Sequence, residues 1–283
     1  QQAILDALTP LKSEYLSTVK KSFNNRWIDF IPTEGKRSGA YSTGGAYDVH
    51  PYILMNWNDD YESLSTLAHE LGHTMHSFYS NANQPFAKAD YATFVAEIAS
   101  TINETLLNNY MVKNAKNDDE KLFLLGSYLD LLRTTIFRQT SFAEFELQIH
   151  KRVEEGQPLT GDDLCNIYYD IVKKYYGHDA GHCVVDPYIQ YEWSYIPHFM
   201  GYTYYVFQYS TSLIYATAFA EKIVTEGNPA VDNFYKILNG GGSKYAVELI
   251  KDAGIDPLSP EPFELTMKKM NKVMDQIEEI LSK

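Results

Sequence analysis

Two histidines and a glutamate within one short stretch could hold a metal ion and use it for chemistry. His69 and His73 are four residues apart, and Glu70 follows the first of them, in the pattern HExxH. On a helix, residues four apart lie on one face, so both imidazoles could bind a single Zn²⁺ ion at ~2.0–2.1 Å. Glu70 would then face a water beside the metal, where hydrolysis needs a general base. The pattern therefore predicts metal-assisted hydrolysis.

This geometry requires a helix, and the surrounding sequence predicts one over residues 60–82. Asp59 and Glu62 form an Asp-x-x-Glu capping signal at its start. No proline interrupts the run before Pro85. The apolar residues that recur at helical spacing are Leu64, Leu67, Ala68, Leu71, Met75 and Phe78. The alternative, two ordinary helix histidines with satisfied polar ends, does not explain a glutamate between them on an apolar stretch.

A catalytic zinc site has three protein ligands and keeps a fourth position open, so a third ligand is needed. One class of enzymes uses a histidine six residues after the second one, but Tyr79 stands there. Glu97 lies 24 residues after His73 in an apolar segment, where a lone carboxylate is costly unless it is paired or metal-bound. We therefore expect Glu97 to be the third ligand, from a helix that returns antiparallel. Glu104, two turns further along, is expected to support a ligand or to lie on the surface.

Several stretches of the chain resemble oligoendopeptidase F, of the thimet-oligopeptidase family of zinc peptidases. The resemblance covers essentially the whole chain and is carried by specific motifs at 38–42, 51–57, 67–77, 83–85, 94–101, 196–205 and 240–243. It implies a mainly α fold, a multi-helix zincin-type (gluzincin) catalytic lobe, one Zn²⁺ per chain and cleavage of short peptides. The enzymes that it resembles are longer and carry an N-terminal lobe. We therefore expect residues 1–283 to form a single zinc-peptidase catalytic domain without that lobe.

A second group of residues could stabilise the oxyanion of a tetrahedral intermediate. His198 precedes Tyr202, Tyr205 and Tyr209, whose spacing places them on one face of a helix. Because the chain has 23 tyrosines, ordinary packing is a strong alternative. The resemblance implies an oxyanion-binding tyrosine and a substrate-contacting histidine in this segment. We favour Tyr205 as the donor and place Tyr202 second, as a substrate-binding residue.

A small β-hairpin or sheet is expected near residues 25–57, where glycines and Pro51 punctuate an alternating pattern. Its Gly39-Ala40-Tyr41 edge could bind substrate by pairing with the peptide backbone as an added strand. Helices are expected at 1–24, 60–82, 90–115, 119–154, 161–176, 198–225, 229–238, 243–253 and 260–282, and an irregular stretch at 177–196.

Composition restricts the partners. The net charge of −13 argues against binding to nucleic acid or to anionic membrane surfaces. Residues 193–220 carry no formal charge, but their many polar groups argue against a membrane span. Two cysteines, Cys165 and Cys183, do not form a disulfide-rich pattern, so we expect two buried, reduced thiols in a cytoplasmic protein. The sequence predicts no oligomeric state.

The function expected from these features is hydrolysis of internal bonds of short oligopeptides by metal-activated water, with Glu70 as general base. Two other functions remain open. One is a zinc carboxypeptidase of similar helical fold, which would need a basic group for the free carboxylate of its substrate. The other is a non-catalytic helical peptide-binding module, although a binding module has no need of Glu70.

Overall fold

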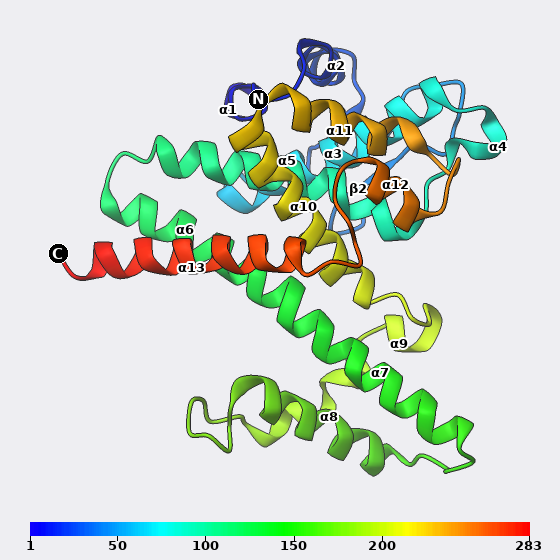
Figure 1. Cartoon of the computed structure of the whole chain (residues 1–283), viewed down its shortest axis with the longest axis vertical. Coiled ribbons are helices and arrows are strands. Elements are labelled where there is room, and N and C mark those ends of the chain that lie inside the picture. Colours follow the sequence, from blue (N-terminus) through cyan, green and yellow to red (C-terminus); the bar gives the residue numbers. More distant parts are fainter. The chain divides into compact units, whose positions relative to one another are not determined.

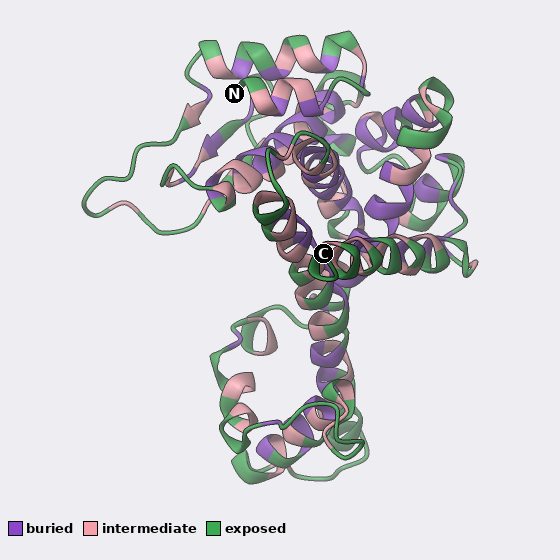
Figure 2. Ribbon diagram, turned by 90° about the vertical axis from the view of Figure 1, so that its left-hand side faces the viewer, coloured by how far each residue is buried: buried purple, intermediate pink, exposed green.

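The computed structural model describes all residues 1–283 and is mainly helical, as the sequence predicts (Figure 1). The chain divides into two compact units, each with a core of its own. Unit 1 contains residues 1–129 and 212–283, and unit 2 contains residues 130–211. In each unit the buried residues gather on the faces where its helices meet (Figure 2).

The helices of unit 1 follow the predicted pattern closely, with one break near the start. They are α1 (Gln2–Ala7), α2 (Ser13–Asn24), α3 (Tyr61–Asn83), α4 (Phe86–Ala89), α5 (Thr93–Lys113), α6 (Asp118–Leu132), α10 (Phe207–Glu226), α11 (Asn228–Gly240), α12 (Ala246–Asp252) and α13 (Glu261–Leu281), where the last residues of α6 and the first of α10 belong to unit 2. The single helix expected over 1–24 is wrong, because Pro10 has no amide hydrogen and disfavours helix at the residue before it.

A small sheet precedes α3, as expected for residues 25–57. Its strands are β1 (Ile28–Asp29), β2 (Tyr41–Thr43) and β3 (Tyr52–Leu54), in the order β1-β3-β2. The central strand β3 is parallel to β1 and antiparallel to β2, with Ser42 opposite Ile53. Strand β2 lies at one edge of the sheet and pairs with a neighbouring strand on one side only.

Helices α3 and α5 pack along each other and form the middle of the unit 1 core. The apolar face of α3 predicted from the sequence is buried at Leu67, Leu71 and Met75. The helix begins one residue later than predicted: the Asp60 side chain, and not that of Asp59, accepts the Ser63 N–H at 2.7 Å. This shift leaves the register of the buried face unchanged.

Unit 2 is built on a helical pair joined by irregular segments. Its elements are a π-helical segment (Arg133–Phe137), α7 (Arg138–Glu154), α8 (Gly161–Tyr176), a 3₁₀ segment (Pro187–Tyr195) and α9 (His198–Gly201). A capping box between Thr160 and Asp163 starts α8. The core of the unit includes Phe142, Phe145 and Tyr168.

The helix predicted over 198–225 is interrupted, which corrects the sequence-based expectation. Helix α9 ends at Gly201 and α10 begins only at Phe207. Between them Tyr204 has a φ of +56°, a left-handed conformation that a helix cannot contain. The tyrosines of this segment therefore lie on a turn and the start of α10, and not on one helix face.

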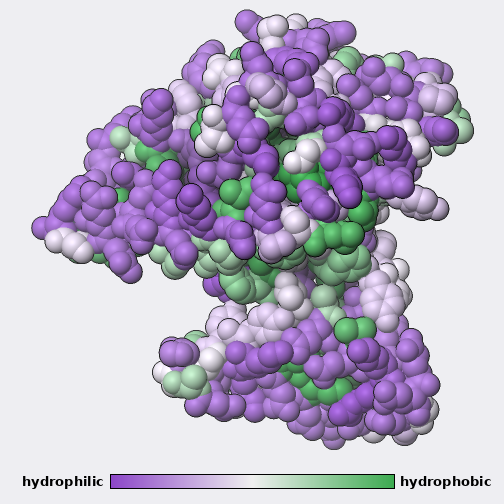
Figure 3. Space-filling view, in the orientation of Figure 1, coloured by the Kyte–Doolittle hydropathy of each residue, from purple (hydrophilic) through white to green (hydrophobic).

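The face of the molecule that Figure 3 shows is mostly hydrophilic. No helix is long and apolar enough to cross a membrane. Neither cysteine forms a disulfide. Cys165 is buried, but Cys183 is exposed, so the expectation of two buried thiols is wrong for Cys183.

Candidate metal centre

Three side chains from α3 and α5 converge in unit 1. The Nε2 atoms of His69 and His73 are 3.1 Å apart. Oε2 of Glu97 lies 3.3 Å from Nε2 of His69 and 3.2 Å from Nε2 of His73. One atom from each residue thus forms a nearly regular triangle, and these three residues are the group in the chain that could hold a metal ion.

The size of this triangle suits a small tetrahedral cation. Ligand atoms that lie ~2.0–2.1 Å from a tetrahedrally bound Zn²⁺ are about 3.3–3.4 Å from one another. The three distances in the cluster, 3.1–3.3 Å, agree with that spacing. Two imidazoles and one carboxylate also leave one tetrahedral position open, as a hydrolytic site requires. The residues therefore fit zinc in both chemistry and spacing.

Glu104 determines which nitrogen of His69 is available. Nδ1 of His69 donates to Oε2 of Glu104 at 2.9 Å, and Ser65 Oγ donates to Oε1 of Glu104 at 3.2 Å. A proton on Nδ1 leaves a lone pair on Nε2 of the neutral ring, which is the atom that faces His73 and Glu97. Carboxylates commonly hold metal-binding histidines in this way. Glu104 is thus placed to support a ligand, the first of the two expectations for it.

The electrostatics of the cluster favour a positive charge at its centre. Burial by itself would lower the pKa of His69, but Glu104 and Glu97 raise it well above its usual value. Burial by itself would raise the pKa of Glu97, but hydrogen bonds and charge from His69 and His73 hold it well below its usual value. In the metal-free protein, proton charge on His69 thus offsets the nearby carboxylates, and a bound cation would supply that positive charge instead.

Glu70 lies beside the cluster, and its side chain is almost fully buried. It is 6% exposed, and burial raises the pKa of its carboxyl group. The backbone of Ser42 in β2 lies close enough to this carboxylate to oppose that rise. The Glu70 Oε2 atom is buried and makes no hydrogen bond. A carboxylate with a raised pKa and an unengaged oxygen is suited to accept a proton.

Strand β2 is fixed to α3 by a side-chain contact close to Glu70. Oγ of Ser42 and Oγ1 of Thr74 are 2.8 Å apart, and Thr74 is fully buried. Of the three residues expected at the substrate edge, only Tyr41 lies in the strand. Gly39 and Ala40 precede it, and the Gly39 carbonyl accepts from Asn56 Nδ2 at 3.0 Å. The expected substrate edge and the candidate base are therefore connected through one short strand.

Gly72, which the sequence reasoning did not single out, allows the ligands of the two helices to meet. A Cβ on Gly72 would lie 2.4 Å from the Cα of Ser100 and 2.5 Å from the carbonyl oxygen of Ala99. Both are backbone atoms of α5 and cannot move away cheaply. The close approach occurs less than one turn from Glu97. Asn103 adds a second link, because its Nδ2 donates to the Ala68 carbonyl at 3.0 Å.

His76 lies outside the cluster, as expected for a packing residue. Its ring is buried and stacks on Tyr91, with centroids 3.6 Å apart and an interplanar angle of 4°. Burial lowers the pKa of His76 to about 3, with a further contribution from His73.

The predicted oxyanion residues gather within unit 2. Nε2 of His198 is 3.2 Å from the Tyr209 hydroxyl. The His198 ring centroid lies 5.4 Å from that of Tyr205 and 5.8 Å from that of Tyr202. Tyr205 in turn lies 5.3 Å from Tyr209. The four side chains form one local cluster, which we call the His198 cluster.

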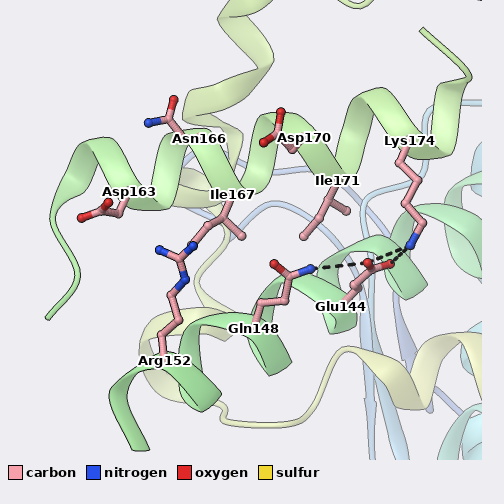
Figure 4. Close-up of a pocket in the computed structure, with 9 residues that line it drawn as sticks. All are labelled: Glu144, Gln148, Arg152, Asp163, Asn166, Ile167, Asp170, Ile171 and Lys174. Carbon is pink, nitrogen blue, oxygen red and sulfur yellow. Dashed lines mark hydrogen bonds and ion pairs between the residues drawn. The ribbon is translucent and has the colours of Figure 1, made fainter. Parts of the chain in front are cut away.

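A polar groove of about 400 Å³ lies between α7 and α8 in unit 2 (Figure 4). Its side chains do not form a cluster like the His198 cluster. Its charged side chains are of both signs. Lys174 donates to both oxygens of Glu144, at 2.8 and 3.1 Å. We interpret the groove as a solvated surface between two helices.

The helical fold and the candidate metal centre were compared with known protein families, and the match is to a family of peptidases. Residues 8–269 match peptidase family M3, and the chain belongs to this family.

Relatives in several bacteria have related sequences. The chain is 46% identical to oligopeptidase PepF of Bacillus subtilis over 280 residues, which cover 99% of this chain and 41% of the relative. It is 43% identical over 272 residues to group B oligopeptidase PepB of Streptococcus agalactiae, covering 95% of this chain and 44% of the relative. The chain therefore spans less than half the length of these relatives.

Solved structures show the same fold. A structure from Chlamydophila abortus matches with a TM-score of 0.87 and 38% identity, over 99% of this chain and 46% of the other. Oligoendopeptidase-F from Enterococcus faecium matches with a TM-score of 0.71 and 32% identity, over 99% of this chain and 43% of the other.

Proposed function

We propose that the protein is a zinc metalloendopeptidase that hydrolyses internal bonds of short peptides. The observation that carries this proposal is the triangle of His69, His73 and Glu97 with the buried carboxylate of Glu70 beside it. Relatives that are named oligopeptidase and oligoendopeptidase support the choice of substrate class.

His69, His73 and Glu97 would hold one Zn²⁺ ion, and Glu104 would keep His69 in the required tautomer. When bound, the ion supplies Lewis-acid chemistry, which polarises a carbonyl and lowers the pKa of a water molecule. Glu70 accepts the proton of the attacking water and then delivers it to the nitrogen of the leaving amine. Its raised pKa and its buried, unengaged Oε2 suit both transfers.

The outer edge of β2 is the proposed substrate edge. A peptide that lies alongside Tyr41 as an added strand would be held mainly through its backbone, so many side chains would be tolerated. Gly39 and Ala40 extend this edge, and Tyr202 is a further proposed substrate contact. Ser42 of the same strand lies near Glu70 and contacts Thr74 of α3, so substrate and base would share one support.

Tyr205 and His198 are the proposed hydrogen-bond donors to the oxyanion. Two observations support this assignment: the sequence resemblance of residues 196–205, and the arrangement of both side chains in the His198 cluster.

The decisive experiment combines metal analysis with cleavage mapping. We expect close to one zinc per chain in the purified protein and an empty site in His69→Ala. Glu70→Gln should retain zinc and lose hydrolysis, because an amide cannot accept the proton. Glu62→Gln, in the first turn of the same helix, is the matched control.

Three outcomes would contradict the proposal. They are near-normal turnover by Glu70→Gln, a metal bound through cysteine, or cleavage confined to peptides with a free C-terminal carboxylate. The last is tested with peptides whose C-terminus is amidated, and it would identify a carboxypeptidase instead.

A further inference from the structure

The turn between α9 and α10 has an unusual backbone. The Tyr205 N–H donates to the Tyr202 carbonyl at 3.2 Å, and the Gln208 N–H donates to the Tyr205 carbonyl at 3.0 Å. Tyr204, which lies inside the first of these two turns, has a φ of +56°. This is a left-handed conformation that bulky residues rarely adopt. A conformation of this kind persists only where the surrounding structure holds it.

Glu146 of α7 provides that hold. Its Oε1 atom accepts the backbone N–H of Tyr204 at 2.7 Å. Glu146 is 2% exposed. Burial lowers the pKa of His198, and the charge of Glu146 acts in the opposite direction. A buried carboxylate is costly, and a charge-assisted hydrogen bond from a backbone amide offsets part of that cost. The neighbouring His150 packs on the Tyr204 ring, with centroids 4.8 Å apart.

The position of Tyr204 in the chain gives this contact its significance. His198 and Tyr202 come before Tyr204, and Tyr205 and Tyr209 come after it. The backbone angles of Tyr204 therefore determine how the two halves of the His198 cluster approach each other. A rotation at Tyr204 would move Tyr205 away from His198, whose ring it approaches at 5.4 Å.

We propose that Glu146 is a positioning residue, which arranges the His198 cluster by holding Tyr204 in its left-handed conformation. Glu146 touches neither substrate nor metal in this role: it holds the Tyr204 backbone, and its charge also acts on His198. The proposal rests on the proposed function, because the cluster matters to catalysis through Tyr205 and His198.

The first test measures the turn itself, independently of activity, by hydrogen exchange at the Tyr204 amide. In Glu146→Ala the exchange should be about 10- to 100-fold faster, because a charge-assisted hydrogen bond is lost. Glu146→Gln keeps a carbonyl acceptor at the same place and should retain most of the protection. Glu144→Ala, on the same helix but directed at Lys174 of α8 (Figure 4), is the matched control. Unchanged exchange in Glu146→Ala would overturn the proposal.

A second variant tests whether the faster exchange results from a general unfolding of unit 2. Glycine adopts a positive φ freely, so Tyr204→Gly should need less support from Glu146. The effect of Glu146→Ala on exchange in residues 202–207 should therefore be smaller in the Tyr204→Gly background. An equal effect in both backgrounds would show that Glu146 acts by general stabilisation, and would also overturn the proposal.

The activity test uses a form of the protein that cleaves peptides. Glu146→Ala should lower kcat by roughly 10²-fold with little change in KM, because misplacement of a reacting group by about 1 Å has an effect of this size. Glu146→Gln should restore most of kcat. If Tyr205→Phe leaves kcat unchanged, the oxyanion assignment fails. The exchange measurement still decides whether Glu146 holds the turn. Loss of exchange protection without any loss of kcat would overturn the catalytic part of the inference.

Discussion

Glu104 can show how much a residue that supports the ligand His69 contributes to zinc affinity without binding the metal itself. It contacts His69 through a hydrogen bond of 2.9 Å and is not one of the three convergent ligands. Glu104→Gln should weaken zinc binding by about 10- to 100-fold, because the carboxylate no longer fixes the tautomer and basicity of His69. Competition with a chelating dye measures this affinity. Glu62→Gln is again the control, and an unchanged affinity in Glu104→Gln would show that His69 needs no such support.

Tyr205 gives a prediction that concerns the transition state. An oxyanion donor acts mainly when charge develops, so Tyr205→Phe should lower kcat by ~10²–10³ and leave KM nearly unchanged. Steady-state kinetics on a defined peptide measure both constants. Tyr195→Phe, at an exposed position of the same unit, is the control. A raised KM with an intact kcat would instead assign Tyr205 to ground-state binding and favour Tyr202 as the donor.

His76 makes the stability of the metal-free protein depend on pH. Burial lowers the pKa of His76 to about 3 in the folded state, while an unfolded histidine has a pKa of ~6.5. Below pH 6.5 the unfolded state therefore binds the additional proton. The contribution of neutral His76 is complete above pH 6.5 and is lost as the pH falls toward 3.

The test compares the parent protein with His76→Phe, which keeps an aromatic ring against Tyr91 and cannot titrate. Between pH 6 and 4 the parent should lose on the order of 1.4 kcal/mol per pH unit more than the variant does. Denaturant unfolding at each pH measures the two free energies. Parallel pH profiles would mean that His76 is solvated or paired in the folded protein.

At the scale of elements, the contact between α3 and α5 determines whether a metal site exists. Gly72→Ala places a methyl group 2.4 Å from the Ser100 Cα, so the helices must separate or tilt. We expect overpacking to lower the free energy of unfolding by roughly 1–3 kcal/mol. The free energy of zinc binding should fall by more than this, because Glu97 moves with α5. Gly126→Ala, where a Cβ meets nothing within 4 Å, is the control. Wild-type zinc affinity in Gly72→Ala would show that the ligands can follow the shift.

These two elements also show what could be predicted from the sequence. The helix that carries His69 and the return of Glu97 on a second helix follow from periodicity, spacing and the cost of burying a lone carboxylate. Gly72 gave no signal, since a glycine in a helix is informative only once its neighbour is known. The interruption at Tyr204 was equally hidden, because tyrosine has no preference for a positive φ and the contact with Glu146 spans 58 residues.

At the scale of the whole molecule, the metal centre belongs to one of two units. All three candidate ligands come from α3 and α5 of unit 1, while α8 lies in unit 2. Removal of zinc should therefore increase hydrogen exchange in α3 and α5 and leave α8 nearly unchanged, because a ligand stabilises the part of the structure that binds it. Exchange mass spectrometry with and without a chelator makes this comparison. An equal increase in both units would mean that they unfold as one.

The division of the chain also has a consequence for synthesis on the ribosome. His69, His73 and Glu97 emerge together, but α11, whose Tyr235 packs on Tyr79 of α3, follows only after all of unit 2 has been made. At bacterial and eukaryotic elongation rates this interval is on the order of ten seconds. During that time the nascent helical hairpin can already capture an ion, while the apolar side of α3 is still uncovered. A metal ion would thus reach the proposed site before the protein has a complete core, and the growing chain would need protection from aggregation at that stage.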